Sequence, residues 1–125
     1  MDAIIYTEDG QEYEMLSGIL MDESPGSVVK RGLLDGHYHL GERYDMVVVS
    51  VDGAQGMELV CEYRERFGSA QIIWITSDPY FAGVAIRKHI FDFIMRPVTE
   101  LRFRESVKTS FSFRKLLNHT QKNRR

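Results

Sequence analysis

Cysteine is almost absent from this chain, and long apolar runs are missing altogether. Cys61 is the only cysteine among 125 residues, which excludes an internal disulfide and is typical of a reducing compartment. No segment approaches the roughly 18 consecutive apolar residues of a membrane-spanning helix. The first five residues also lack the basic start and the long apolar stretch of a secretory signal. We therefore expect a cytoplasmic protein that does not enter the membrane.

The usual marks of catalysis are missing as well. No glycine-rich phosphate loop follows any apolar segment, and no nucleophile with an adjacent base can be recognised. His37 and His39 lie two positions apart, but this pair alone is weak evidence for a metal site. The sequence therefore predicts neither an enzyme nor a resident cofactor.

Charge is nearly balanced overall but unevenly distributed. The formal net charge is −2, yet the segment from Thr99 to Arg125 contains eight Lys or Arg residues and only two acids, Glu100 and Glu105. Such a basic end could contact nucleic acid, or it could be a solvated last helix that leads into a linker. Both readings stay open at this point.

What the chain does contain is a regular alternation of short apolar segments and helical patterns. Strands are predicted at 3–6, 27–30, within 44–52, at 71–75 and at 91–95. Helices are predicted from the spacing of Tyr13, Leu16 and Leu20, and at 56–67, at 80–88 and after Thr99. Strands that alternate with helices imply right-handed βαβ units and a parallel sheet. We therefore predict a single α/β domain of the doubly wound, three-layer kind.

The central predicted strand carries the position that matters most for function. Its four consecutive apolar residues, Met46 to Val49, are typical of a strand covered on both faces. Ser50 follows them directly, and Asp52 comes two residues later. Chemistry in open parallel sheets gathers beyond the carboxyl ends of the strands. Ser50 should therefore determine what such a site can do.

The strand ends, taken together, resemble the active site of response-regulator receiver (CheY-like) domains. The residues that carry this resemblance are Thr7, Glu8, Asp9, Ser50, Thr76, Arg96 and Pro97. The segments 72–78 and 91–98 are similar in sequence to the receivers of LytTR-type transcriptional regulators. The resemblance implies a flavodoxin-like (βα)5 sheet of order 2-1-3-4-5. It also implies a receiver domain over 1–117, followed at 118–125 by a basic tail or the start of a linker to an output domain.

The pattern departs from the family at the positions that carry its chemistry. In receivers, an acidic pair after the first strand holds Mg²⁺, an aspartate after the third accepts a phosphoryl group, and a lysine before a proline pairs with it. Here Thr7 and Glu8 occupy the positions of the acidic pair. Ser50 occupies the position of the phosphoacceptor aspartate, and Arg96 replaces the lysine. Thr76 matches the family's phosphate-sensing Thr or Ser.

These substitutions predict a pocket that is not switched by phosphate. A serine hydroxyl is a poor nucleophile until a base removes its proton, and carboxylates such as Glu8 or Asp9 are weak bases. Two of three metal-binding carboxylates are replaced, so Glu8 and Asp9 are expected to recruit Mg²⁺ weakly, if at all. The alternative is a receiver still switched by phosphate with Mg²⁺, through Ser50 or, by a shifted strand, through Asp52.

Arg96 keeps the positive charge of the family's lysine but carries it on a planar guanidinium instead of a compact ammonium. Its planar guanidinium can form two parallel hydrogen bonds, and we hypothesise that it engages Glu8 or Asp9 and locks one state. By resemblance, the Arg96–Pro97 peptide bond is cis. Phe93 occupies the position of the aromatic residue that swings inward when receivers are activated. Because it lacks a hydroxyl that could form a hydrogen bond at the surface, its ring is expected to stay in the pocket.

The resemblance also implies how the protein would act. Its output surface would lie within residues 80–117, including Tyr80, Phe93 and Phe111, and would bind protein partners. A homodimer is expected, since the last helix has more apolar residues than one packed face needs. DNA would be contacted only through an output domain beyond residue 125.

Overall fold

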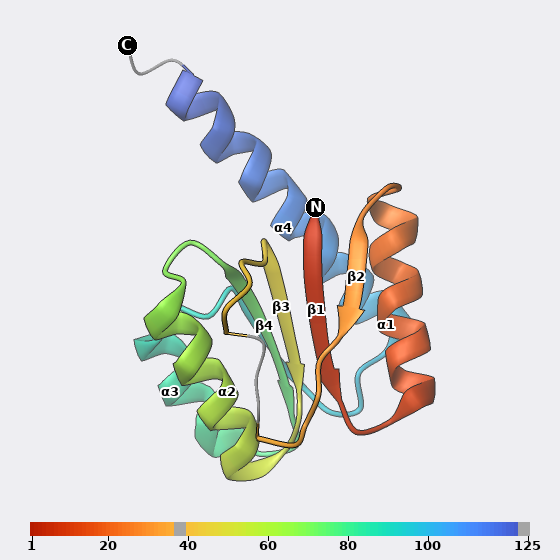
Figure 1. The fold of residues 1–125 in the computed structure, drawn as a ribbon, viewed down its shortest axis with the longest axis vertical. Coiled ribbons are helices and arrows are strands. Elements are labelled where there is room, and N and C mark those ends of the chain that lie inside the picture. Colours follow the sequence, from red (N-terminus) through yellow and green to blue (C-terminus); the bar gives the residue numbers. More distant parts are fainter. Residues whose placement is uncertain (37–39, 123–125) are drawn as a thin grey trace.

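A parallel sheet of five strands forms the centre of the residues that the structure describes (Figure 1). The structure is a computed structural model, and it describes residues 1–36 and 40–122, with side chains as far as Leu117. The strands are β1 (Asp2–Thr7), β2 (Val28–Arg31), β3 (Met46–Ser50), β4 (Gln71–Thr76) and β5 (Asp92–Met95). Their order, β2-β1-β3-β4-β5, confirms the predicted doubly wound flavodoxin-like fold.

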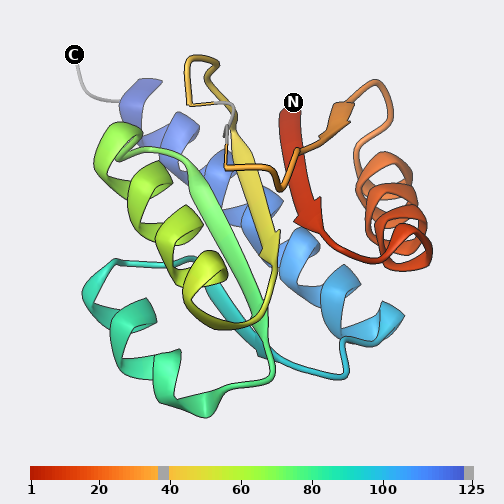
Figure 2. The same ribbon diagram turned by 60° about the horizontal axis from the view of Figure 1, so that its bottom comes forward.

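Helices cover both faces of this sheet and complete three layers. α1 (Gly10–Glu23) and α4 (Glu100–Lys122) pack on one face, and α2 (Gly53–Arg66) and α3 (Ala82–Arg87) pack on the other. Figure 2 shows α2 and α4 on opposite sides of the strands. A short 3-10 turn, η1 (Pro79–Phe81), precedes α3.

The two-residue period of the strands divides the core between the two faces. Val47, Val49 and Trp74 point toward α2, whereas Met46 and Val48 point toward α1 and α4. Every residue of β3 is buried, as expected for a strand covered on both sides. This is why β3 is a continuous apolar run rather than an alternating one.

The register of the strands brings their carboxyl ends to one edge of the sheet. Thr7 of β1 pairs with Ser50 of β3, and Ser50 pairs with Ile75 of β4. Thr76 pairs with Met95, the last residue of β5. The predicted register is thereby confirmed, because β3 ends at Ser50 and Asp52 lies two residues beyond it.

Local signals in the sequence placed several helix starts correctly. Asp78 accepts a hydrogen bond from the backbone N–H of Tyr80 at 2.9 Å, and Pro79 occupies the first position of the turn. Thr99 accepts one from the N–H of Arg102 at 3.1 Å and so caps α4. The sequence leaves either Ser77 or Asp78 as the first cap, and the structure shows Asp78; the predicted cap at Thr99 is confirmed.

Two helical segments differ from the prediction. The helix expected at 80–88 is divided into η1 and a six-residue α3. α2 begins at Gly53 rather than at Gly56, because Gly53 adopts a left-handed conformation (φ 74°) that turns the chain into the helix at once. Gly56 then lies where the helix passes the backbone of Val51, and a Cβ there would be 1.9 Å from the Val51 carbonyl oxygen.

The last helix is the longest element. α4 spans 23 residues, so the boundary expected at residue 117 falls inside it. Figure 1 shows its C-terminal part extending past the sheet. Across residues 1–36 and 40–122, the helices include none with both the length and the apolar character that crossing a bilayer requires.

Candidate functional site

Four of the residues singled out in the sequence lie at the carboxyl edge of the sheet. Thr7, Ser50 and Thr76 are the last residues of β1, β3 and β4, and Arg96 follows β5 directly. Thr7, Ser50 and Thr76 are all buried, with at most 2% of their surface exposed. The fold therefore brings these positions together, as the resemblance predicts.

A carboxylate that sequence reasoning missed lies at the centre of this edge. Glu12, in the first turn of α1, accepts hydrogen bonds from the hydroxyls of Thr7 and Ser50 on its Oε2 atom; the Ser50 contact measures 2.9 Å. Its Oε1 atom accepts from Nη1 of Arg96 at 2.7 Å. The Glu12 side chain is only 10% exposed. A nearly buried carboxylate with three donors is thus held among the strand ends.

The position of Glu12 follows from how α1 begins. Asp9 is the N-cap residue, and its Oδ1 accepts from the backbone N–H groups of Gln11 and Glu12 at 2.9 and 3.4 Å. Glu12 is therefore the third residue of the helix, the position from which a glutamate often reaches back to the cap. Here it turns toward Ser50 and Arg96 instead. The spacing of Asp9 and Glu12 was the signal that could have drawn attention to Glu12.

Arg96 connects this carboxylate to the end of β3. Its Nη2 atom donates to the carbonyl oxygen of Ser50 at 3.0 Å and to the Ser50 hydroxyl at 2.8 Å, and its Nε atom donates to Asp52 at 3.4 Å. Although burial alone would lower the pKa of Arg96, its bonds to Glu12 and Asp52 raise that pKa above the ordinary value. The guanidinium is therefore a permanent cation of the site.

The hypothesis that Arg96 pairs with Glu8 or Asp9 is wrong. The ion pairs of Arg96 are with Glu12 and Asp52. Asp9 is engaged in capping α1, and Glu8 is exposed to solvent beyond the end of β1. The strand turns Thr7 toward the site, and the chain leaves the sheet at the next residue.

Asp52 links two neighbouring loops at the rim of the site. Its carboxylate accepts from the backbone N–H of Ser77 at 2.8 Å and from the Ser77 hydroxyl at 3.2 Å. Burial alone would raise the pKa of Asp52, but the Ser77 N–H bond and the Arg96 charge outweigh it and hold the pKa below its ordinary value. Asp52 is therefore ionised and engaged at neutral pH.

The donor set does not fit the Mg²⁺ ion that receivers use. Mg²⁺ requires oxygen ligands with free lone pairs, usually one or two carboxylates. Glu12 already has Arg96 as its cation, and Thr7 and Ser50 present neutral hydroxyls that donate to it. Within residues 1–36 and 40–122, no group of three or more His, Cys, Asp or Glu side chains could hold a metal ion. His37 and His39 lie outside the described residues.

The remaining predicted residues lie around the network rather than in it. Thr76 is fully buried, and its hydroxyl accepts from the N–H of Asp78 at 3.3 Å. Phe93 is partly buried with its ring edge-on to Trp74, at 5.6 Å between centroids. The Arg96–Pro97 peptide bond is cis, as the resemblance predicts.

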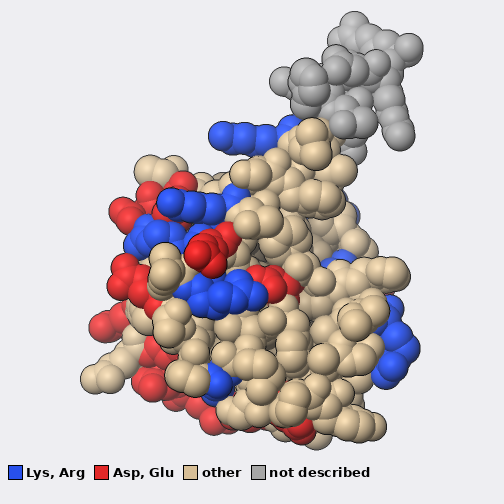
Figure 3. All heavy atoms as spheres, turned by 180° about the vertical axis from the view of Figure 1, so that it is seen from behind, with Lys and Arg blue, Asp and Glu red and all other residues tan. Residues whose placement is uncertain are grey.

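The predicted output surface carries exposed apolar side chains. Tyr80 is 81% exposed, and Phe111 packs at the edge of the core between α1 and α4. The other exposed apolar residues of this region are Ile86, Met95, Leu101, Phe113, Leu116 and Leu117. Figure 3 shows charged side chains gathered over α1 and the adjoining part of α4, with few on the side where α3 and β5 lie.

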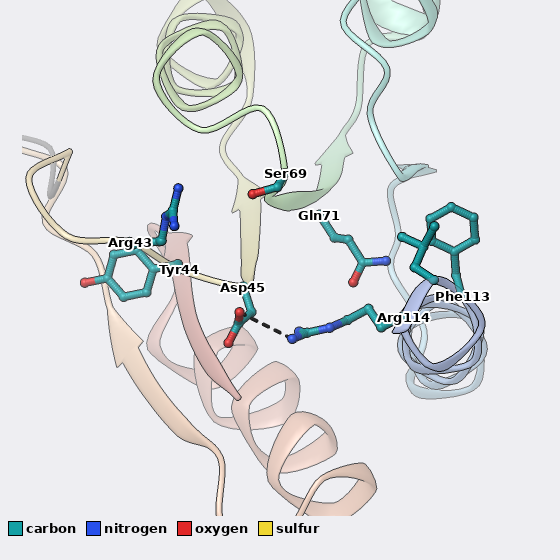
Figure 4. A pocket seen from close by; sticks show the side chains of 8 residues that line it. Arg43, Tyr44, Asp45, Ser69, Gln71, Phe113 and Arg114 are labelled. Carbon is teal, nitrogen blue, oxygen red and sulfur yellow. Dashed lines mark ion pairs between the residues drawn. The ribbon is translucent and has the colours of Figure 1, made fainter. Parts of the chain in front are cut away.

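A separate hollow of about 280 Å³ lies at the amino-terminal edge of the sheet (Figure 4). Figure 4 shows Arg114 reaching from α4 to Asp45, with an ion pair of 3.3 Å. Gln71, at the start of β4, donates to the carbonyl oxygen of Ser110 at 3.3 Å. These contacts fasten α4 to the strand starts, at the other end of β3 from Ser50.

Comparisons with known proteins identify the fold. No protein-family model matches the chain, and no curated protein matches it in sequence. Among solved structures, it is similar to HP1043, an orphan response regulator of H. pylori, with 17% identity and a TM-score of 0.71 over 88% of this chain and 95% of that one. It is also similar to the response regulatory domain of mrkE from Klebsiella pneumoniae, with 18% identity and a TM-score of 0.64 over 90% and 96% of the two chains.

A longer protein is similar over part of its length. NtrX from Brucella abortus, in a complex with ADP, has 21% identity and a TM-score of 0.68 over 94% of this chain. This chain spans only 28% of the length of NtrX. At these identities the comparisons show the fold, which is that of CheY-like receiver domains.

Proposed function

We infer that this chain, which has the receiver fold, is a receiver module of bacterial two-component signalling that works without phosphorylation. The observation that carries this inference is the Glu12 carboxylate, which lies between Ser50 and Arg96 at the strand ends. A negative charge fixed by a cation at this edge is what phosphorylation would otherwise supply. The module would therefore hold one state permanently.

The chemistry of Ser50 supports this inference. Its hydroxyl donates to Glu12 and accepts from Arg96, so both its proton and a lone pair are engaged. Glu12 is a poor base for an alcohol, since it already has Arg96 and Thr7 as partners. Ser50 is also 1% exposed, so a phosphodonor has little access to it.

The output is proposed to be protein binding through residues 80–117. The exposed apolar side chains of α3, β5 and α4 fit a surface that pairs with a second copy of the chain or with an effector. We propose a cytoplasmic regulator of transcription, of the LytTR-type kind, in which DNA is bound by an output domain after residue 125. The basic residues at the chain end would then belong to the linker.

Treatment with a phosphodonor tests this proposal directly. The wild-type chain is incubated with acetyl phosphate and Mg²⁺, and its intact mass is measured, with an active receiver as the positive control. We expect no phosphorylated species. Addition of one phosphoryl group, lost in Ser50→Ala or in Asp52→Asn, would identify the acceptor and establish the phosphate-switched alternative instead.

A further inference from the structure

We propose that Glu12 is the tethered ligand of a carboxylate-binding site, and that withdrawing it leaves a site for a small free carboxylate. The site consists of Arg96, Ser50 and Thr7, whose donors converge on the two oxygens of Glu12. This inference rests on the proposed function, because it treats the strand-end pocket as one filled from within the chain. It adds the chemical class of ligand that the pocket accepts.

The donors of this site are held in place without Glu12. Thr7 and Ser50 are paired residues at the ends of β1 and β3. Arg96 is fixed independently by the carbonyl oxygen of Ser50 and by Asp52. Glu12 comes from another element, α1. The three residues that form the site therefore lie at the edge of the sheet, whereas the carboxylate that fills it belongs to a helix.

Hydrogen bonding also fixes the direction of both hydroxyls. The Thr7 oxygen accepts from the backbone N–H of Asp9 at 3.2 Å, and the Ser50 oxygen accepts from Nη2 of Arg96 at 2.8 Å. The protons of both hydroxyls thus remain for the group at the centre of the site. The groups that contact the Glu12 carboxylate are two hydroxyl donors and one guanidinium, so a guest in its place is selected as an anion over neutral or cationic groups.

The size of the site indicates which anion. Changing Glu12 to alanine removes two carbons and two carboxylate oxygens, which are the heavy atoms of acetate. Thr7 and Ser50 are nearly inaccessible, at 2% and 1% exposure, and they limit the space to a group of this size; Arg96, whose side chain is 27% exposed, lies on the side that solvent reaches. In the wild type the tethered carboxylate has a high effective concentration, and free acetate cannot compete with it.

Thermal unfolding of Glu12→Ala tests the site. The melting temperature is measured in sodium chloride and in sodium acetate at equal ionic strength. We expect acetate to raise the melting temperature of Glu12→Ala by about 3 °C or more, as binding to the folded state alone requires, and to leave the wild type unchanged. Glu12→Gly, which leaves a larger space, should respond more to propionate than to acetate.

Matched variants decide the result. Glu14→Ala removes an exposed glutamate from the same helix and should show no acetate effect, and Glu12→Ala combined with Arg96→Ala should lose it. If Glu12→Ala is unfolded in chloride, recovery of its circular dichroism in acetate is the same readout. An equal response of Glu12→Ala and Glu14→Ala, no response in either Glu12 variant, or stabilisation by phosphate but not by acetate would overturn the proposal. These outcomes are distinct from phosphorylation of the wild type, which would contradict only the proposed function.

Discussion

Arg96 joins three residues that come from separate parts of the fold. Its guanidinium contacts Glu12 of α1, Ser50 of β3 and Asp52 of the following loop. A lysine could not reach this set, because an ammonium lacks the planar fork that spans several oxygens. Arg96 and Ser50, which the resemblance sets at the lysine and the aspartate of receivers, therefore contact each other directly.

Removing Arg96 should be costly because it leaves Glu12 as a nearly buried, unpaired charge. We expect Arg96→Ala to lower the free energy of unfolding by about 2–4 kcal/mol, measured by urea denaturation. Arg87→Ala removes an exposed arginine from α3 and should change it by less than about 0.5 kcal/mol. Equal effects of the two variants would contradict the role given to Arg96.

Gly56 is required by close backbone approach rather than by its conformation. Its added Cβ would be 1.9 Å from the Val51 carbonyl oxygen, so Gly56→Ala must shift α2 away from β3. We expect a loss of about 1–3 kcal/mol in the free energy of unfolding. Gly18→Ala, in α1 with no atom within 4 Å of the new methyl group, should instead stabilise the chain by about 0.5–1 kcal/mol. Chemical denaturation of both variants distinguishes these signs.

The elements show which parts of this molecule local sequence can predict. The apolar run of β3 and the cap at Thr99 act over a few positions, and each was identified correctly. The start of α2 was misplaced because a left-handed Gly53 turned the chain earlier than the apolar pattern indicated.

The partner of Arg96 could not be predicted in this way. Glu8, Asp9 and Glu12 are three carboxylates within five residues, and the sequence does not say which of them faces the sheet. That choice depends on the direction in which β1 ends and on the first turn of α1. Tertiary geometry decides it, and no local pattern reports tertiary geometry.

Arg64 of α2 is a single side chain that holds the connection between α2 and β4. Its guanidinium donates to the carbonyl oxygens of Gly68 at 2.8 Å and Ala70 at 2.9 Å, and so supports the turn that leads into β4. We expect Arg64→Ala to lower the free energy of unfolding by about 1–3 kcal/mol, measured in urea. Arg66→Ala, an exposed change two residues away, is the control and should have little effect. A small loss in Arg64→Ala as well would mean that water replaces these bonds freely.

At the scale of the whole molecule, acid should weaken the fold through Asp92. This carboxylate accepts two bonds from Arg102, at 2.7 and 2.9 Å. Burial alone would raise the pKa of Asp92, but the bonds from Arg102 and the charge of its guanidinium outweigh it and hold the pKa below its ordinary value.

A depressed pKa in the folded state means that the stabilisation is present above the unfolded value, about 3.9, and is lost as the pH falls through the folded value. The unfolding free energy should therefore decline below about pH 4, and it should decline less in Asp92→Asn. Glu62→Gln, an exposed change, should follow the wild type. Urea denaturation across the pH range measures this, and parallel curves for all three proteins would exclude the contribution of Asp92.

Self-association is expected at the surface made by α3, β5 and α4. Ile86 and Leu101 are 77% and 70% exposed there. The wild type should sediment as a dimer, and the double change Ile86→Glu with Leu101→Glu should yield a monomer, because two charges would be buried at the interface. Val28→Glu changes an equally apolar residue, 63% exposed on β2 at the other edge of the sheet, and should remain dimeric. A monomeric wild type at high concentration would rule out this interface.

The bond between Glu12 and Arg96 joins positions 84 residues apart in the chain. During synthesis, α1, β1 and β3 all emerge before Arg96 does. Until then, the carboxylate of Glu12 has no cation to neutralise it and remains better solvated in water than between the strands. The arrangement at the sheet edge can therefore close only after β5 and Arg96 have been synthesised. A ribosome-bound fragment that stops short of β5 would leave α1 loosely attached.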